Sequence, residues 1–149
     1  MNLKTKIMKI KNLVCSALLL TLIITIGNAQ DSKAKIKQVA AQFIKGADLQ
    51  DGKLLEAVLE PKSLQYVLIG GKLSTFSAED YIKMVNEKKL GGKPRKISYR
   101  HAEFLGNNLA VVVLNAVSEE YDFFYQLSLI KLADGDWEIV GVTAEISGV

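Results

Sequence analysis

The only histidine of this 149-residue chain, His101, is the side chain best suited to moving protons near neutral pH. Strand parity predicts that Tyr99 and His101 share one face of a strand. If that face meets a tyrosine across a pocket, the pair would supply a general base and an oxyanion donor. The neighbouring charges of Arg100 and Glu103 favour the alternative, a solvated surface histidine without a catalytic role.

Metal and thiol chemistry have little support in the sequence. The only cysteine, Cys15, lies in an N-terminal segment that we expect to be removed, and a single histidine argues against a zinc site. Asp134, Asp136 and Glu145 match outer positions of a calcium-binding EF-hand loop, but Ile139 stands where that loop needs glycine. We therefore expect no metal and no cofactor.

Two further charged groups have ordinary structural explanations. Asp48 and Asp51 flank the turn after the first predicted helix, where helix capping explains both. A basic cluster around the glycine pair at 91–92 could meet an anionic partner, but we interpret it as a solvated loop. Its members are Lys88, Lys89, Lys93, Arg95 and Lys96. Because no series of aromatic residues interleaves the cluster, we expect no nucleic-acid partner.

Residues 1–29 have the pattern of a cleaved signal peptide. Four lysines precede an apolar run from Leu13 to Ile26, and residues 1–29 contain no acidic residue. After the run come Gly27, Asn28 and Ala29, which place small residues at the first and third positions of a cleavage site. The run has 14 residues, fewer than the roughly 20 of a membrane span. Cys15 lies at the start of the run, which argues against lipidation. We expect an exported protein, periplasmic or extracellular, with no membrane span after cleavage.

Cleavage also changes the charge of the protein. The full chain has 19 basic and 16 acidic residues, a net charge of +3. Without residues 1–29 there are 15 basic residues against 16 acidic ones, a net charge of −1. The overall electrostatic argument for nucleic-acid binding disappears with the signal peptide.

Amphipathic helices are predicted before the main strands. Asp31 or Ser32 can cap a first helix, Asp51 can cap a short second helix that ends at Pro61, and Ser77 can cap a third. Between the last two, Leu64–Ile69 and Lys72–Phe76 flank two glycines and form a hairpin. The apolar stripe of the first helix consists of Ile36, Val39, Ala40, Phe43, Ile44 and Ala47. The inner side of the third carries Tyr81, Met84 and Val85.

Four long strands are predicted after the helices, and their short connecting turns indicate an antiparallel meander. They are Arg95–Leu105, Leu109–Ser118, Tyr121–Leu132 and Trp137–Ser147. In the third of them, alternate residues from Tyr121 to Leu129 form one strongly apolar face. The pattern predicts one α+β domain, residues 30–149, with N-terminal helices packed on a strongly curved antiparallel sheet and a pocket between the layers.

This order of elements resembles the NTF2-like superfamily, which has a cone-shaped fold, and within it the bacterial lumazine-binding and SnoaL-like branch. The resemblance covers residues 30–149 and rests on Phe43–Asp48, on Ser77–Tyr81, and above all on Tyr121–Leu129 followed by Asp134–Val140. Members of the superfamily include isomerases, dehydratases, binding proteins and accessory domains, so the fold does not decide the function.

The resemblance implies a ligand pocket inside the cone. We expect its lining to include Phe43, Tyr81, Val85, Tyr99, Phe123 and Tyr125. Enzymes of this fold place a base in the cone opposite a tyrosine or a protonated acid, and the catalytic candidates are accordingly His101, Tyr99, Glu145 and Asp122. We favour a non-catalytic exported domain that binds a small, partly apolar or aromatic ligand or serves as an accessory domain, with a homodimer formed through the sheet. The alternative is a cofactor-free isomerase, lyase or cyclase of the ketosteroid-isomerase or SnoaL type.

Overall fold

Six strands form a single sheet in the computed structural model, which describes residues 32–149. Their order across the sheet is β2-β1-β6-β5-β4-β3. The strands are β1 (Leu59–Ile69), β2 (Lys72–Ser77), β3 (Lys96–Phe104), β4 (Leu109–Val117), β5 (Tyr121–Lys131) and β6 (Trp137–Gly148). The four predicted C-terminal strands are therefore confirmed to within one residue at each end, and β3 to β6 form the expected antiparallel meander.

The predicted α+β fold, with helices packed on a curved sheet, is confirmed. One strand pair departs from the antiparallel pattern, because β1 runs parallel to β6. The predicted hairpin of β1 and β2 is present, but it joins the free edge of the meander. This pairing satisfies backbone groups that β6 would otherwise leave unpaired at an edge. The result is a mixed sheet.

The second predicted helix ends earlier than expected. Asp51 caps it, accepting a hydrogen bond from the backbone N–H of Lys53 at 3.0 Å, but α2 covers only Gly52–Glu56. Leu59 already belongs to β1, and the pairing of β1 with β6 is irregular between Leu59 and Leu64. Pro61 lies within this irregular stretch, where its missing N–H disturbs no regular ladder.

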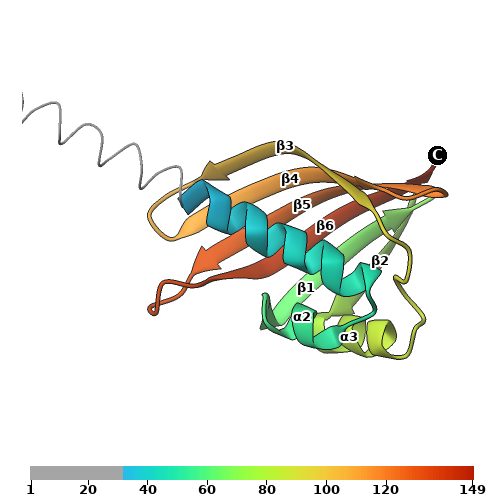
Figure 1. The fold of residues 1–149 in the computed structure, drawn as a ribbon, viewed down its shortest axis with the longest axis horizontal. Helices are drawn as coiled ribbons and strands as arrows, with labels where there is room; N and C mark the ends of the chain where they lie inside the picture. Colours follow the sequence, from blue (N-terminus) through green and yellow to red (C-terminus); the bar gives the residue numbers. More distant parts are fainter. Residues whose placement is uncertain (1–31) are drawn as a thin grey trace, which may run out of the picture. The chain divides into compact units, whose positions relative to one another are not determined.

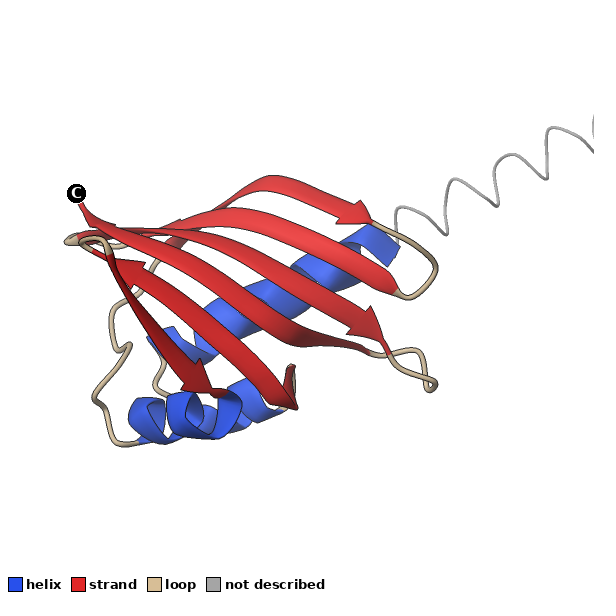
Figure 2. Ribbon diagram, turned by 180° about the vertical axis from the view of Figure 1, so that it is seen from behind, coloured by secondary structure: helices blue, strands red, loops and turns tan. Residues whose placement is uncertain are grey.

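The helices lie on the inner side of the curved sheet. The first, residues 32–48, crosses the inner face, and α2 and α3 (Ala78–Asn86) lie beside β1 and β2 (Figure 1). Seen from behind, the sheet covers the first helix (Figure 2). The predicted stripe is confirmed at its buried members, which are Ile36, Ala40, Phe43, Ile44 and Ala47. Ser77 caps α3 as predicted, through its hydroxyl oxygen and the backbone N–H of Asp80 at 3.1 Å.

Residues 35–149 form one compact unit around a single hydrophobic core. The predicted signal peptide, its cleavage site and the capping residue Asp31 lie outside the described residues. Within residues 32–149, no helix combines the length and the apolar character that a membrane crossing needs.

Candidate functional site

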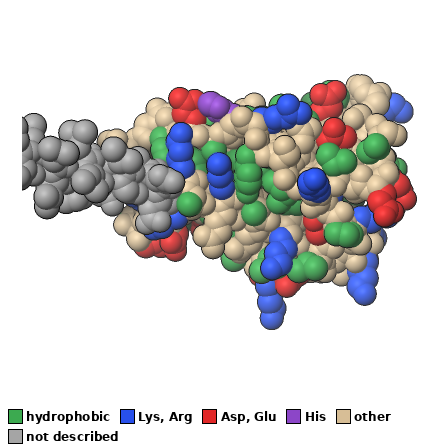
Figure 3. Space-filling model, turned by 45° about the horizontal axis from the view of Figure 1, so that its top comes forward, with side chains coloured by type: hydrophobic (Ala, Val, Ile, Leu, Met, Phe, Trp, Pro, Cys, Tyr) green, Lys and Arg blue, Asp and Glu red, His purple; other side chains and the backbone are tan. Residues whose placement is uncertain are grey.

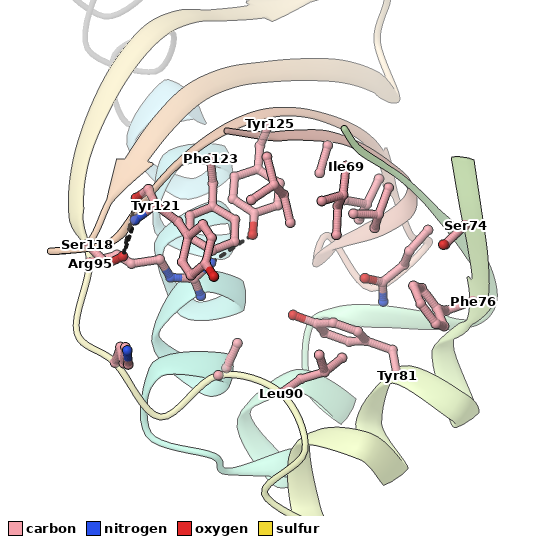
Figure 4. A pocket seen from close by; sticks show the side chains of 18 of the residues that line it. Ile69, Ser74, Phe76, Tyr81, Leu90, Arg95, Ser118, Tyr121, Phe123 and Tyr125 are labelled. Atoms are coloured by element: carbon pink, nitrogen blue, oxygen red, sulfur yellow. Dashed lines mark hydrogen bonds between the residues drawn. The ribbon is translucent and has the colours of Figure 1, made fainter. Parts of the chain in front are cut away.

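A cavity of about 450 Å³ opens between the helices and the inner face of the sheet (Figure 4). Its aromatic lining comes from three elements, with Tyr81 from α3, Phe76 from β2, and Tyr121, Phe123 and Tyr125 from β5. Aliphatic residues complete most of the lining, namely Val67, Ile69, Leu90, Val142, Ala144 and Ile146. The size and the apolar lining are those of small-molecule sites, which span roughly 300–1,000 Å³.

The aromatic rings of the cavity are held in place by one another. Phe43, fully buried on the first helix, stacks on Tyr81 with ring centres 5.8 Å apart. It meets Tyr125 edge-on at 6.0 Å, and Tyr125 in turn stacks on Phe123 with a centre distance of 5.9 Å. Ring pairs in these geometries attract each other beyond the area they bury. Phe43 therefore positions the two tyrosines from behind.

Arg95 is a buried charge at the wall of this cavity, with only 6% of its side chain exposed. Its Nε donates to Oδ1 of Asp48 at 2.5 Å, and its two terminal nitrogens donate to the Tyr125 hydroxyl at 2.7 Å and to the Ile44 carbonyl at 3.2 Å. Burial alone would lower the pKa of Arg95, but Tyr125 and Asp48 outweigh it and raise that pKa above its ordinary value. The guanidinium therefore stays charged, and the Tyr125 oxygen, which accepts from it, keeps its own proton for another partner.

Two interpretations of charged residues from the sequence need correction here. Asp51 caps a helix as predicted, but Asp48 accepts from both the backbone N–H and the side chain of Arg95. Arg95 accordingly does not belong to a solvated basic loop. It turns inward because the carboxylate at the end of the first helix offers a buried partner that the loop's other basic residues lack.

The loop before β3 closes one side of the cavity because glycine stands at two positions. Gly91 has a φ of 76°, and a Cβ there would overlap the carbonyl oxygen of Ala47. The backbone N–H of Gly92 donates to that same oxygen at 3.1 Å. This contact fixes the loop on the first helix and brings Leu90 and Lys93 to the cavity.

Gln65 on β1 is a polar residue of the lining that is almost completely buried, with 1% exposed. Its amide nitrogen has no hydrogen-bond partner among the described residues. Sequence reasoning missed it, because on β1 the more apolar alternate positions are Leu64, Tyr66 and Leu68. The structure places Leu64 and Tyr66 outward, each 40% exposed, and Gln65 inward.

The structure brings half of the predicted pocket residues to the cavity. Tyr81, Phe123 and Tyr125 line it. Phe43 and Val85 pack in the core behind the lining. Tyr99 lies elsewhere, where its hydroxyl donates to the backbone carbonyl of Lys37 on the first helix at 2.8 Å.

The expectation that Tyr99 and His101 share a strand face is wrong. The register of β3 against β4 shifts between them, so that Tyr99 pairs with Leu114 and His101 with Val113. The extra residue is a β-bulge, which reverses the facing of every residue after it. His101 is exposed on the outer face, with its Nε2 2.6 Å from a carboxylate oxygen of Glu103. As the only histidine of the chain, it is the purple side chain at the surface in Figure 3.

The two carboxylates named as catalytic candidates also lie outside the cavity. Asp122 accepts at 3.0 Å from Asn115, which itself accepts from Arg100 at 2.8 Å. Glu145 is exposed and pairs in register with Phe124, on the outer face of the sheet. The predicted homodimer through this face stays a prediction.

The family model described as "Putative lumazine-binding" matches residues 31–143. The chain belongs to this lumazine-binding family. Comparison with curated proteins gives no match. The family match confirms the predicted resemblance to the lumazine-binding branch.

Solved structures place the fold of this lumazine-binding family member among NTF2-like proteins. An NTF2-like protein of unknown function from Silicibacter pomeroyi is 15% identical, with a TM-score of 0.70 over 80% of this chain and 98% of that one. One from Methylobacillus flagellatus is 20% identical, with a TM-score of 0.66 and coverages of 78% and 93%. A ketosteroid isomerase-like protein from Erwinia carotovora is 12% identical, with a TM-score of 0.61 and coverages of 76% and 94%. At these identities the likeness shows the fold alone.

Two of the cavity tyrosines, Tyr81 and Tyr125, give this lumazine-binding family member a specific response to alkaline pH. Burial raises the pKa of both phenols; Tyr125 and Asp48 raise that of Tyr81 further, whereas the hydrogen bond from Arg95 partly offsets the rise at Tyr125. In the unfolded chain a tyrosine titrates near about 10. Above that pH the folded state holds protons that the unfolded state has lost, so the free energy of unfolding falls as pH rises.

We therefore expect the stability of the wild type to fall more steeply between pH 9 and pH 11 than that of a Tyr81→Phe, Tyr125→Phe double variant. Urea unfolding at each pH measures this, and the phenolate absorbance should show two of the five tyrosines ionising only with unfolding. If the free energy of unfolding fell equally with pH in both proteins, the raised pKa values of Tyr81 and Tyr125 would be contradicted.

Proposed function

We propose that this protein binds a small ligand with an aromatic or other ring in the cavity between its helices and its sheet. The observation that carries the proposal is the cavity itself, which has a volume of about 450 Å³. Its aromatic lining residues are Phe76, Tyr81, Tyr121, Phe123 and Tyr125. Flat aromatic walls favour flat partners, because offset and edge-on ring contacts are attractive. The family description, which names lumazine, a two-ring heterocycle, agrees with this size and shape.

The polar part of the lining restricts the charge of the ligand. Among the described residues that line the cavity none is acidic, whereas three, Lys89, Lys93 and Arg95, are cationic. Glu87 and Glu120 pair with the two lysines at the surface, and such exposed pairs are weak enough to exchange partners. An uncharged or anionic ligand therefore suits the cavity better than a cation.

The placement of the catalytic candidates supports binding over proton transfer. A general base must come within hydrogen-bond reach of the proton it abstracts. His101, Asp122 and Glu145 belong to the outer face of the sheet, on the opposite side from the cavity. Tyr99 is turned toward the first helix. The alternative function, a cofactor-free isomerase or lyase, would need a general base other than these four residues.

The binding test compares two adjacent phenylalanines of β5. Phe123 lines the cavity, whereas Phe124 is 44% exposed on the outer face. With lumazine and 1-tetralone as probes, followed by NMR shifts of cavity residues, we expect saturable binding to the wild type. Phe123→Ala should weaken it about tenfold, the equivalent of about 1.4 kcal/mol of lost ring contact.

Two control variants separate the cavity from the rest of the surface. Phe124→Ala removes the same ring from the opposite face, and His101→Gln removes the only imidazole. Both should bind the probes as the wild type does. Failure of both probes to bind the wild type, or equal loss in Phe123→Ala and Phe124→Ala, would refute the proposal.

We also propose that the protein acts outside the cytoplasm, in the periplasm or beyond it. The support is the sequence of residues 1–29, with its lysines, its apolar run and its small residues before position 30. Mass spectrometry of protein recovered from the envelope or medium of its host should find Gln30 at the N-terminus. A mature protein that keeps Leu13–Ile26 would contradict this.

A further inference from the structure

Gln65 lies in the middle of the inner face where β1 meets its two neighbours. It pairs in register with Phe76 on β2 and with Val142 on β6, both of which line the cavity with it. Only 1% of Gln65 is exposed, and its Nε2 has no hydrogen-bond partner among the described residues. A primary amide carries two N–H donors and an acceptor oxygen.

An unpaired buried donor destabilises a protein, and such groups are rare unless something outside the chain completes them. One other buried side chain in the described part is unpaired, the hydroxyl of Ser63, but it does not line the cavity. A leucine at position 65 would fill similar space without this penalty. The amide is therefore best explained by a partner that enters the cavity.

Two further donors point into the same space. Tyr81 turns its hydroxyl into the cavity (Figure 4). The hydroxyl of Tyr125 accepts from Arg95 and so has its proton left to donate. Both phenols stay protonated well above neutral pH, because burial raises their pKa values. The described lining residues include no acidic group. The cavity therefore offers hydrogen-bond donors to a ligand that carries a hydrogen-bond acceptor.

We propose that Gln65 determines specificity by donating a hydrogen bond to an acceptor oxygen of the ligand, and that the ligand is an uncharged or anionic ring compound bearing a carbonyl or equivalent oxygen. This inference rests on the proposed binding function. A ring compound of the same shape that lacks the oxygen should bind more weakly, because it leaves the Gln65 amide without a hydrogen-bond partner.

The test uses two bicyclic probes that differ by one carbonyl, 1-tetralone and tetralin. Their affinities are measured by NMR titration of the wild type, of Gln65→Leu, and of Gln126→Leu. Gln126 is the matched control, an exposed glutamine on the outer face of β5. The hydration of each free probe is the same in every titration. A change between variants in the ratio of the affinities for 1-tetralone and tetralin therefore reports on the protein alone.

In Gln65→Leu the preference for 1-tetralone over tetralin should fall about tenfold, the size of one lost hydrogen bond to a group then left unpaired. The ligand-free variant should melt higher than the wild type, by about 2–4 °C, because a buried unpaired donor is gone. Gln126→Leu should change neither quantity. A merely structural role for Gln65 would lower the melting temperature instead.

The possible outcomes separate the two proposals. If both probes bind the wild type but the ratio is unchanged in Gln65→Leu, the role of Gln65 is refuted and cavity binding stands. If the preference falls while the melting temperature rises, both are supported. If neither probe binds the wild type, cavity binding fails and the role of Gln65 fails with it.

Discussion

Replacing Asp48 by alanine should lower the free energy of unfolding by about 3–5 kcal/mol, the range for removing one member of a buried ion pair. Asp48 and Arg95 are only 12% and 6% exposed, so the guanidinium cannot recover its hydration when the carboxylate is lost. The carboxylate also accepts from the backbone N–H of Arg95 at 3.0 Å, which ties the start of β3 to the end of the first helix. Urea unfolding measures the change.

A double-mutant cycle distinguishes the pair from general damage. Asp48→Ala combined with Arg95→Leu should be less destabilised than the sum of the two single variants, since the second change removes the uncompensated charge. Glu120→Ala breaks the exposed pair with Lys93 and serves as the control, with an expected change of about 1 kcal/mol or less. A loss for Asp48→Ala as small as that of Glu120→Ala would show that the pair is solvated.

Local patterns in the sequence predicted most of the elements, because each depends on residues close together in the chain. The stripe from Ile36 to Ala47 predicted the first helix, and alternation predicted β5 with its apolar face inward. The partner of β1 could not be predicted this way. Its parallel pairing with β6 joins Gln65 to Val142, which lie 77 residues apart in the sequence, and no local signal encodes it.

The candidate site was predicted in part, for a related reason. Aromatic residues on the predicted inner positions, Tyr81, Phe123 and Tyr125, do line the cavity. His101 was placed on the face of Tyr99 because parity counts residues and cannot detect a bulge, which depends on how β3 pairs with β4. The ion pair of Arg95 and Asp48 joins residues 47 positions apart, so local sequence patterns could not predict it either.

Phe43 and Phe123, two aromatic residues with the same predicted role, should differ when each is replaced by alanine. Phe43 is 1% exposed and packs between Tyr81 and Tyr125, so its loss empties a core site and should lower the free energy of unfolding by about 3–5 kcal/mol. Phe123 faces the cavity on one side, where there is already space, and its loss should be smaller, about 1–3 kcal/mol.

The control for both is Phe124→Ala, which removes an outward ring from the same strand and should change stability by about 1 kcal/mol or less. The effects of the two substitutions on ligand binding should have the opposite order to their effects on stability. Phe123 lines the cavity directly, whereas Phe43 acts only through the rings it supports. At a temperature where all variants stay folded, Phe123→Ala should therefore weaken 1-tetralone binding more than Phe43→Ala does. A larger stability loss for Phe123→Ala than for Phe43→Ala would mean that no open space adjoins Phe123, and the cavity on which ligand binding depends would be closed in solution.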